Sequence, residues 1–148
     1  MAGFRIAIVV SRYNDFVTDS LRDASLATLA ESGVAPEDVT VHAVPGAFEI
    51  PQGASLVARA LSPDAVVCLG CVIRGATPHF EYISSAVAHG ITQAALDTGV
   101  PMAFGVLTTN SVEEALERSA AGPANKGREA ALAAIEMATL ARGLAGRA

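Results

Sequence analysis

The sequence predicts an α/β protein in which a four-stranded parallel sheet lies between two layers of helices. Short β-branched apolar segments alternate with longer segments of helical periodicity throughout the chain. Strands that alternate with helices pair in parallel through right-handed crossovers. The segment Ala65–Val72 is apolar at nearly every position, as expected of a strand covered on both faces. We therefore expect a three-layer α/β/α sandwich formed by one domain, residues 1–148.

Four apolar segments are short enough to be strands and end at polar or turn-forming residues. The expected strands are Phe4–Val10, Val39–Val44, Ala65–Val72 and Met102–Leu107. Ser-Arg-Tyr-Asn follows the first of them and Pro45-Gly46 follows the second. Such residues favour turns over further strand.

The first two helices have recognisable start and stop signals. Asn14 and Asp15 are residue types that cap a helix, and Gly33 is expected to end the helix that follows them. A second helix is expected to begin near Glu49–Pro51, because proline is tolerated in the first turn of a helix.

Three further helices are expected in the second half of the chain. The third carries apolar residues at steps of three and four over Phe80–Ala94. A capping-box pattern at Asn110–Glu114 predicts a short fourth helix that ends near Ser119. Gly122-Pro123 then interrupts the chain, and the alanine-rich segment Lys126–Leu140 forms the last helix.

Composition and charge exclude several classes of protein. With 51% hydrophobic and 17% charged residues, the chain is too apolar to be intrinsically disordered. The net charge of −5 and the lack of a basic run argue against a nucleic-acid partner. No apolar stretch approaches the ~20 residues that span a bilayer, so no membrane partner is expected. So low a charged fraction favours large subunit interfaces, and hence a homo-oligomer.

The amino end and the cysteines point to a reducing compartment. The first apolar run is shorter than the core of a secretory signal, so we expect a cytoplasmic protein. Cys68 and Cys71 fall at the end of a predicted buried strand, with no further ligands at zinc-site spacing. They are therefore expected to pack as small apolar side chains rather than to bind metal or exchange disulfides.

The carboxyl edge of a parallel sheet is where such folds bind ligands. The segments expected at that edge are Ser11–Asn14, Pro45–Glu49, Cys71–His79 and Leu107–Asn110. None carries a dinucleotide-binding or P-loop glycine motif. Tyr13 either stacks on a planar ligand or covers the sheet edge, and Gly46 lets the backbone pass close to a ligand. Glu49 is either a site residue or a first-turn acid that complements a helix dipole.

A phosphate site is predicted where the third strand leads into the third helix. Helix amino ends bind anions, with Thr77 as the expected N-cap and Pro78 as the first helical residue. His79 would sit beside a phosphate there and carry a proton, or it is an ordinary exposed histidine. Arg118 and Lys126 either neutralise a phosphate or are solvated surface charges.

Five motifs, in order along the chain, resemble the 6,7-dimethyl-8-ribityllumazine synthase family. They are Ser11–Phe16 (SRYNDF), Val44–Pro51 (VPGAFEIP), Gly70–Glu81 (GCVIRGATPHFE), Phe104–Asn110 (FGVLTTN) and Asn125–Ala130 (NKGREA). Each motif alone is weak, but the ordered set extends from the first strand to the last helix and is specific.

The resemblance implies an enzyme of the penultimate step of riboflavin biosynthesis. The family condenses 5-amino-6-ribitylamino-uracil with 3,4-dihydroxy-2-butanone 4-phosphate to 6,7-dimethyl-8-ribityllumazine and releases phosphate and water. It uses no metal or redox cofactor. It assembles as homopentamers or as icosahedral shells of pentamers, with active sites at subunit interfaces.

The resemblance also implies roles for individual residues. His79 would transfer the proton. The residues implied around the pyrimidine are Tyr13, Ala47, Phe48, Glu49, Cys71, Val72, Ile73 and, from a neighbouring subunit, Phe104. Ala76, Thr77 and Arg118 would hold the phosphate of the four-carbon substrate, and Lys126 would be an accessory residue near the pocket.

Other functions remain compatible with the flavodoxin-like fold that we predict. A non-catalytic homologue would bind riboflavin or another flavin, or would only form a shell. An FMN electron carrier is a further hypothesis, but no serine- and threonine-rich phosphate loop follows the first strand.

Overall fold

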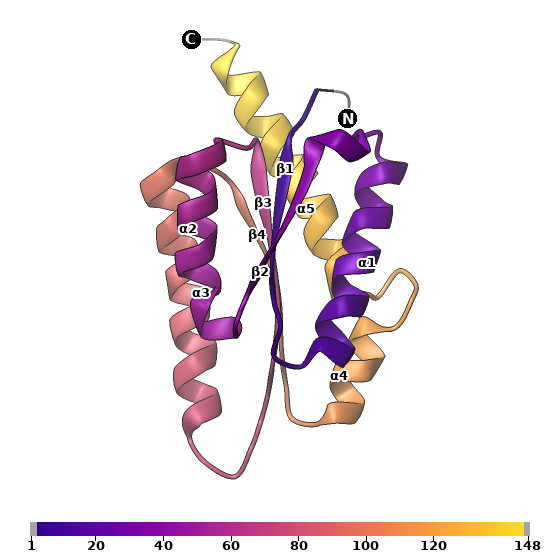
Figure 1. Ribbon diagram of the computed structural model, residues 1–148, viewed down its shortest axis with the longest axis vertical. Coiled ribbons are helices and arrows are strands. Elements are labelled where there is room, and N and C mark those ends of the chain that lie inside the picture. The colour runs from indigo at the N-terminus through magenta and orange to yellow at the C-terminus, as the bar shows by residue number, and fades with distance from the viewer. Residues whose placement is uncertain (1–2, 147–148) are drawn as a thin grey trace.

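The computed structural model describes residues 3–146 and contains a four-stranded, all-parallel sheet with the strand order β2-β1-β3-β4 (Figure 1). The strands are β1 (Ile6–Ser11), β2 (Val39–Val44), β3 (Ala65–Ile73) and β4 (Met102–Thr109). β1 therefore lies between β2 and β3, and β2 and β4 are the two edge strands. Residues 1–2 and 147–148 of the predicted domain lie outside the described residues.

Helices cover both faces of the sheet, which confirms the predicted three-layer α/β/α sandwich (Figure 1). One layer consists of α2 (Ile50–Leu61) and α3 (His79–Thr98). The other consists of α1 (Asp15–Glu31), α4 (Val112–Ser119) and α5 (Lys126–Ala145). Within residues 3–146, no helix combines the length and the apolar character that crossing a membrane requires.

Each strand contributes to two hydrophobic cores, because successive side chains point to opposite faces of a sheet. Ile6 and Ile8 of β1 pack in the core beneath α1 and α5, whereas Ala7 and Val9 pack in the core beneath α2 and α3. All six residues of β1 are buried. The central strands must therefore be apolar on both faces, which explains why their sequences do not alternate.

The predicted strands and helices all form, and their ends differ from the prediction by a few residues. β1 begins two residues later than expected, β4 continues to Thr109, and α5 continues to Ala145. Two short 3₁₀ helices, Pro36–Asp38 and Ala47–Glu49, were not predicted. The second follows Gly46 and leads directly into α2, so the loop after β2 is compact.

The predicted role of Asn14 as a side-chain cap of α1 is wrong. Asn14 occupies the N-cap position, but its side chain makes no capping hydrogen bond. Its backbone adopts the left-handed conformation (φ 67°), which asparagine tolerates better than most residues. Its Nδ2 instead donates to the carbonyl oxygen of Cys71 at 3.1 Å, tying the start of α1 to the end of β3.

Gly127 determines how closely α5 approaches α1. A Cβ at Gly127 would lie 2.1 Å from the carbonyl oxygen of Leu21, and the Ser25 hydroxyl donates to the Gly127 carbonyl at 2.7 Å. We expect Gly127→Ala to lower the free energy of unfolding by about 1–3 kcal/mol or more, since overpacking forces the two helices apart. Denaturant titration measures this change.

Gly143 provides a matched control on the same helix, because nothing lies within 4 Å of a Cβ built there. Gly143→Ala should raise the free energy of unfolding by about 0.5–1 kcal/mol, the usual advantage of alanine over glycine in a helix. Equal effects of the two substitutions would contradict the close contact at Gly127.

Candidate functional site

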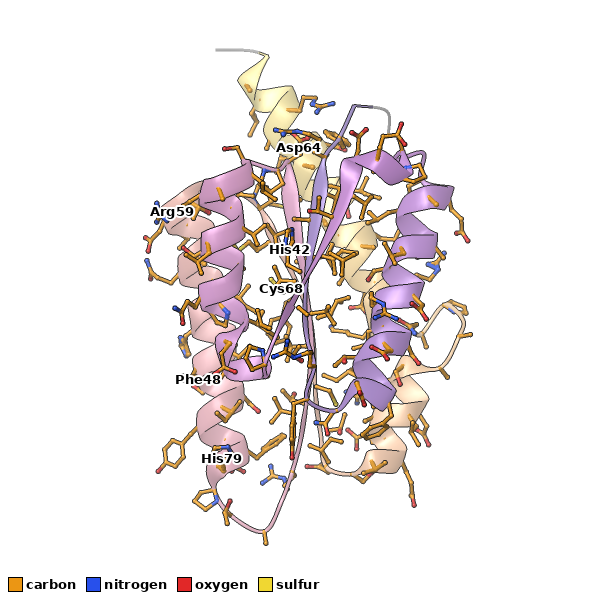
Figure 2. The ribbon with its side chains drawn as sticks, in the orientation of Figure 1. His42, Phe48, Arg59, Asp64, Cys68 and His79 are labelled. Atoms are coloured by element: carbon orange, nitrogen blue, oxygen red, sulfur yellow. The ribbon has the colours of Figure 1, made fainter. Side chains whose placement is uncertain are left out.

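A cavity of about 360 Å³ opens at the carboxyl ends of β1, β2 and β3. Eight of the predicted site residues line it: Tyr13, Ala47, Phe48, Glu49, Cys71, Val72, Ile73 and His79. Asn14, Gly46 and Ile83 complete the lining. Figure 2 shows Phe48 and His79 at the lower end of the α2–α3 layer, where the carboxyl ends of the strands lie.

The strand order explains why these segments, distant in sequence, meet. Because β1 is the neighbour of both β2 and β3, the loops that follow all three strands emerge side by side. Backbone bonds join the first two loops: Arg12 N–H donates to the Val44 carbonyl at 2.8 Å, and Tyr13 N–H donates to the Pro45 carbonyl at 3.0 Å. The Asn14 amide joins the third loop through Cys71. The cavity wall is thus tied together by hydrogen bonds.

Two aromatic rings at this cavity are unusually exposed. Tyr13 is 73% exposed and Phe48 is 59% exposed, although burying such rings normally stabilises a fold. Small-molecule sites combine apolar walls with a few polar groups that orient the ligand. The two rings supply the apolar surface, and Glu49 and His79 supply polar groups at the same cavity. The arrangement suits a planar ligand with a polar edge.

Helix α3 begins one residue later than predicted. Pro78, expected as the first helical residue, is the N-cap, because its carbonyl oxygen accepts the first helical hydrogen bond, from Glu81 N–H at 3.2 Å. Thr77 was expected to be the N-cap, and that prediction is wrong: no side chain caps α3. His79 is therefore the first residue of the helix, and the exposed residues Ala76 and Thr77 precede it outside the cavity lining.

A second cavity, of about 390 Å³, gathers three of the five remaining predicted residues at β4, the edge strand next to β3. Phe104 of β4, Arg118 of α4 and Lys126 of α5 all line it, and none of them lines the cavity that contains His79. Phe104 is 38% exposed despite its size. A single chain thus divides the predicted site into two separate groups of residues.

The two cations of this second cavity each have a carboxylate nearby. Arg118 Nη2 lies 3.7 Å from Glu114 Oε1, and Lys126 Nζ lies 3.4 Å from Glu129 Oε1. Asn125 positions Lys126, because its buried side chain accepts from two backbone N–H groups at the start of α5. Solvent-exposed ion pairs are weak, so a phosphate dianion can replace these carboxylates as the partner of the cations.

Cys68 and Cys71 pack as the sequence predicts. Cys68 lies in the core beneath α2 and α3, and Cys71 lies in the core beneath α1 and α5, so they point to opposite faces of β3. Both are free thiols. Burial raises the pKa of Cys68 to about 12 and that of Cys71 to about 11. No group of three His, Cys, Asp or Glu side chains that could hold a metal ion occurs in the described part of the chain.

Asn14 and Ile83 belong to the first cavity but were not predicted as site residues. Ile83 stands four residues after His79 in α3, so both lie on the same helix face; this spacing was the available signal. Asn14 lies in the predicted edge segment Ser11–Asn14, but its hydrogen bond to Cys71 could not be predicted, because it depends on the pairing of β1 with β3.

Together these features define a flavodoxin-like α/β protein with a small-molecule cavity at the carboxyl edge of its sheet. Comparison with known proteins gives the family. The family model of 6,7-dimethyl-8-ribityllumazine synthase matches residues 3–142, and the chain belongs to this family. The resemblance predicted from the motifs is confirmed.

Two relatives named 6,7-dimethyl-8-ribityllumazine synthase match nearly the whole chain. One, from Syntrophus aciditrophicus (strain SB), is 53% identical over 140 residues, which cover 95% of this chain and 91% of the relative. Another, from Desulfotalea psychrophila (strain LSv54 / DSM 12343), is 51% identical over 138 residues, covering 93% and 89% respectively.

The raised thiol pKa values predict low cysteine reactivity. At pH 8, a pKa near 11 instead of 9 leaves about 10²-fold less thiolate at Cys71. Native protein should therefore react slowly with Ellman's reagent, whereas unfolded protein should show both thiols at once. The thiol pKa values are higher in the folded than in the unfolded protein. The free energy of unfolding should therefore decrease as the pH rises above the unfolded pKa, and these thiols should not affect it at lower pH. Rapid reaction of one thiol in native protein would contradict the burial.

Proposed function

We propose that this chain condenses 5-amino-6-ribitylamino-uracil with 3,4-dihydroxy-2-butanone 4-phosphate to form 6,7-dimethyl-8-ribityllumazine. Its family membership supports this reaction, which is the penultimate step of riboflavin biosynthesis. The observation that carries the proposal is the single cavity that brings two exposed aromatic rings beside His79. The reaction transfers no electrons to an external acceptor, so it needs no redox cofactor.

The first cavity is the proposed site of the pyrimidine. The Tyr13 ring stacks on the heterocycle, and the Phe48 side chain adds apolar contact. Residues 47–49 follow β2 and residues 71–73 end β3, so both segments lie at the carboxyl edge of the sheet. Their backbone N–H and C=O groups hydrogen-bond the polar edge of the heterocycle. Such contacts fix the ring so that its 5-amino group faces the second substrate.

His79 is the proposed proton-transfer residue. The amine attacks the ketone carbon, and the resulting carbinolamine loses water to give an imine. Loss of the proton on the hydroxyl-bearing carbon then expels the phosphate from the adjacent carbon and leaves an enol, which is protonated to a ketone. The ribitylamino nitrogen attacks this ketone and closes the second ring with loss of water. Each step moves a proton, and the His79 imidazole at the wall of the cavity is placed to take and return it.

The proposed phosphate site combines the start of α3 with the second cavity. Ala76 and Thr77 precede the amino end of α3, where N–H groups and the helix dipole favour an anion. Arg118 supplies a planar donor for the phosphate, and Lys126 supplies an accessory positive charge.

The two cavities complete one active site only across a subunit interface. Phe104 was expected to reach the site from a neighbouring subunit; Arg118 and Lys126 share its cavity, so we assign them to the same neighbour. The outer edge of β4 in one copy then covers the Tyr13–His79 cavity of the next. Exposed rings on both surfaces support such an interface, because contact would bury them. By family analogy we propose cytoplasmic homopentamers, alone or in icosahedral shells.

A direct assay tests the function. Purified protein is supplied with both substrates, and lumazine fluorescence and phosphate release are followed together. We expect equal amounts of both products at a rate above the spontaneous reaction. A yellow, flavin-bound protein without turnover would instead support a non-catalytic flavin-binding homologue.

Replacement of His79 should slow the reaction without abolishing it. If positioning of the two substrates supplies most of the acceleration, His79→Asn lowers kcat by about 10²–10⁴-fold or less, the usual contribution of general acid–base catalysis. Steady-state kinetics measures this effect. Complete loss of activity with unchanged substrate binding would contradict a mechanism led by positioning.

Arg118→Ala should raise the KM of the phosphorylated substrate and leave pyrimidine binding unchanged.

Co-assembly of Arg118→Ala chains with His79→Ala chains tests whether the two residues come from different copies. Since the proposed site takes His79 from one copy and Arg118 from the next, about a quarter of the sites in a random mixture regain both residues. Mixed assemblies that are no more active than the average of the two parent variants would place both residues in one chain.

A further inference from the structure

Arg74 connects three parts of the structure at the carboxyl end of β3. Its backbone N–H donates to the Thr109 carbonyl of β4 at 2.8 Å, and its Nε donates to Asn110 Oδ1 at 2.9 Å. Its Nη1 forms an ion pair with Glu81 in the first turn of α3. The guanidinium carbon lies 4.5 Å from the centre of the Phe80 ring. One planar cation therefore joins the end of β4 to the beginning of α3.

These contacts enclose the loop that carries the proposed phosphate residues. Residues 75–78 connect Arg74 to α3, and all of them are exposed. Nothing lies within 4 Å of a Cβ built at Gly75, and no side chain caps α3. Packing thus contributes little to the position of Thr77 and His79. Arg74 makes contacts at both ends of the loop, with Asn110 and with Glu81, and these contacts restrict it.

The combination of contacts matters more than any one of them. A single exposed ion pair stabilises little. Here one rigid guanidinium engages a carboxylate, an amide oxygen and an aromatic face together, so each contact orients the group for the others. The hydrogen bond from Arg74 holds the pKa of Glu81 below its ordinary value, and the carboxylate stays charged at neutral pH.

We propose that Arg74 is a positioning residue, which holds residues 75–79 through Glu81 and Asn110 so that Thr77 and His79 meet the phosphorylated substrate. This inference rests on the proposed function. We assign Arg74 to the loop because its Nε and Nη1 donors are directed to Asn110 and Glu81, and the Glu81→Ala variant tests direct phosphate binding by its remaining donors. The same contacts connect the loop to the turn between β4 and α4, the helix that carries Arg118.

Three substitutions test the proposal with steady-state kinetics. Arg74→Gln should lower kcat/KM for the phosphorylated substrate by on the order of 10²-fold, because a small misplacement of reacting groups is costly. Glu81→Ala and Asn110→Ala should each cause a weaker form of the same defect. The KM of the pyrimidine should stay within about twofold in all three, since Arg74 does not line its cavity.

Glu81→Ala separates positioning from direct binding. If Arg74 were itself a phosphate ligand, removing its carboxylate partner would leave the KM of the phosphorylated substrate unchanged or lower it. A raised KM in Glu81→Ala supports the positioning role, and an unchanged or lowered KM overturns it. Arg22→Gln is the matched control, because Arg22 forms comparable exposed ion pairs with Asp19 and Asp23 on α1, away from both cavities.

Hydrogen exchange of the loop provides a readout that does not depend on activity. The hydrogen-bonded backbone amides at the two ends of the loop, those of residues 74, 81 and 82, should exchange faster in Arg74→Gln and Glu81→Ala than in the wild type and in Arg22→Gln. Unchanged exchange overturns the proposal. If the wild type forms no lumazine, the proposed function fails, whereas faster exchange in the variants still supports the restraint of the loop by Arg74.

Discussion

The order of the strands in the parallel sheet determines what one chain can assemble by itself. With β1 between β2 and β3, three strand ends converge and their loops form a single cavity. β4 lies beyond β3 at the outer edge, so the residues on it and on the helices after it form a different cavity. Ligands bind parallel α/β sheets at the carboxyl edge, and here that edge supplies the Tyr13 and Phe48 rings and His79 but not Arg118.

The two cavities are chemically complementary. One presents exposed aromatic rings and an imidazole, and the other presents Arg118 and Lys126 beside Phe104. In the proposed reaction, the first set would hold the planar amine and the second set the phosphorylated ketone, and a fixed relation between them would replace a chance encounter of the two substrates. Bringing together surfaces of two copies would bury the exposed rings and exclude water from the cations, which strengthens their attraction for a phosphate. Assembly and catalysis would then depend on the same contact.

The sequence was sufficient to predict the fold and most of the residues that line the main cavity. Strand–helix alternation and the apolar character of Ala65–Val72 predicted the parallel sheet, and eight of the eleven residues that line the first cavity were predicted as site residues. Local signals were less reliable where a long-range contact decides the conformation. Asn14 bonds to Cys71 instead of capping α1, and the contacts of Arg74 join segments that lie far apart in the chain. The grouping of Arg118 with Phe104 likewise follows from the position of β4, which periodicity does not reveal.

We propose that one active site is built from the Tyr13–His79 cavity of one copy and the Phe104–Arg118 cavity of another. The most direct measurement is an experimental structure of the assembled protein with a non-reactive phosphonate analogue of the two joined substrates. We expect the heterocycle to lie against Tyr13 and the phosphonate beside Thr77, with Phe104 and Arg118 of a neighbouring subunit in contact with the ligand. A ligand whose ring and phosphonate are both held by one subunit, with no contact from its neighbour, would contradict it.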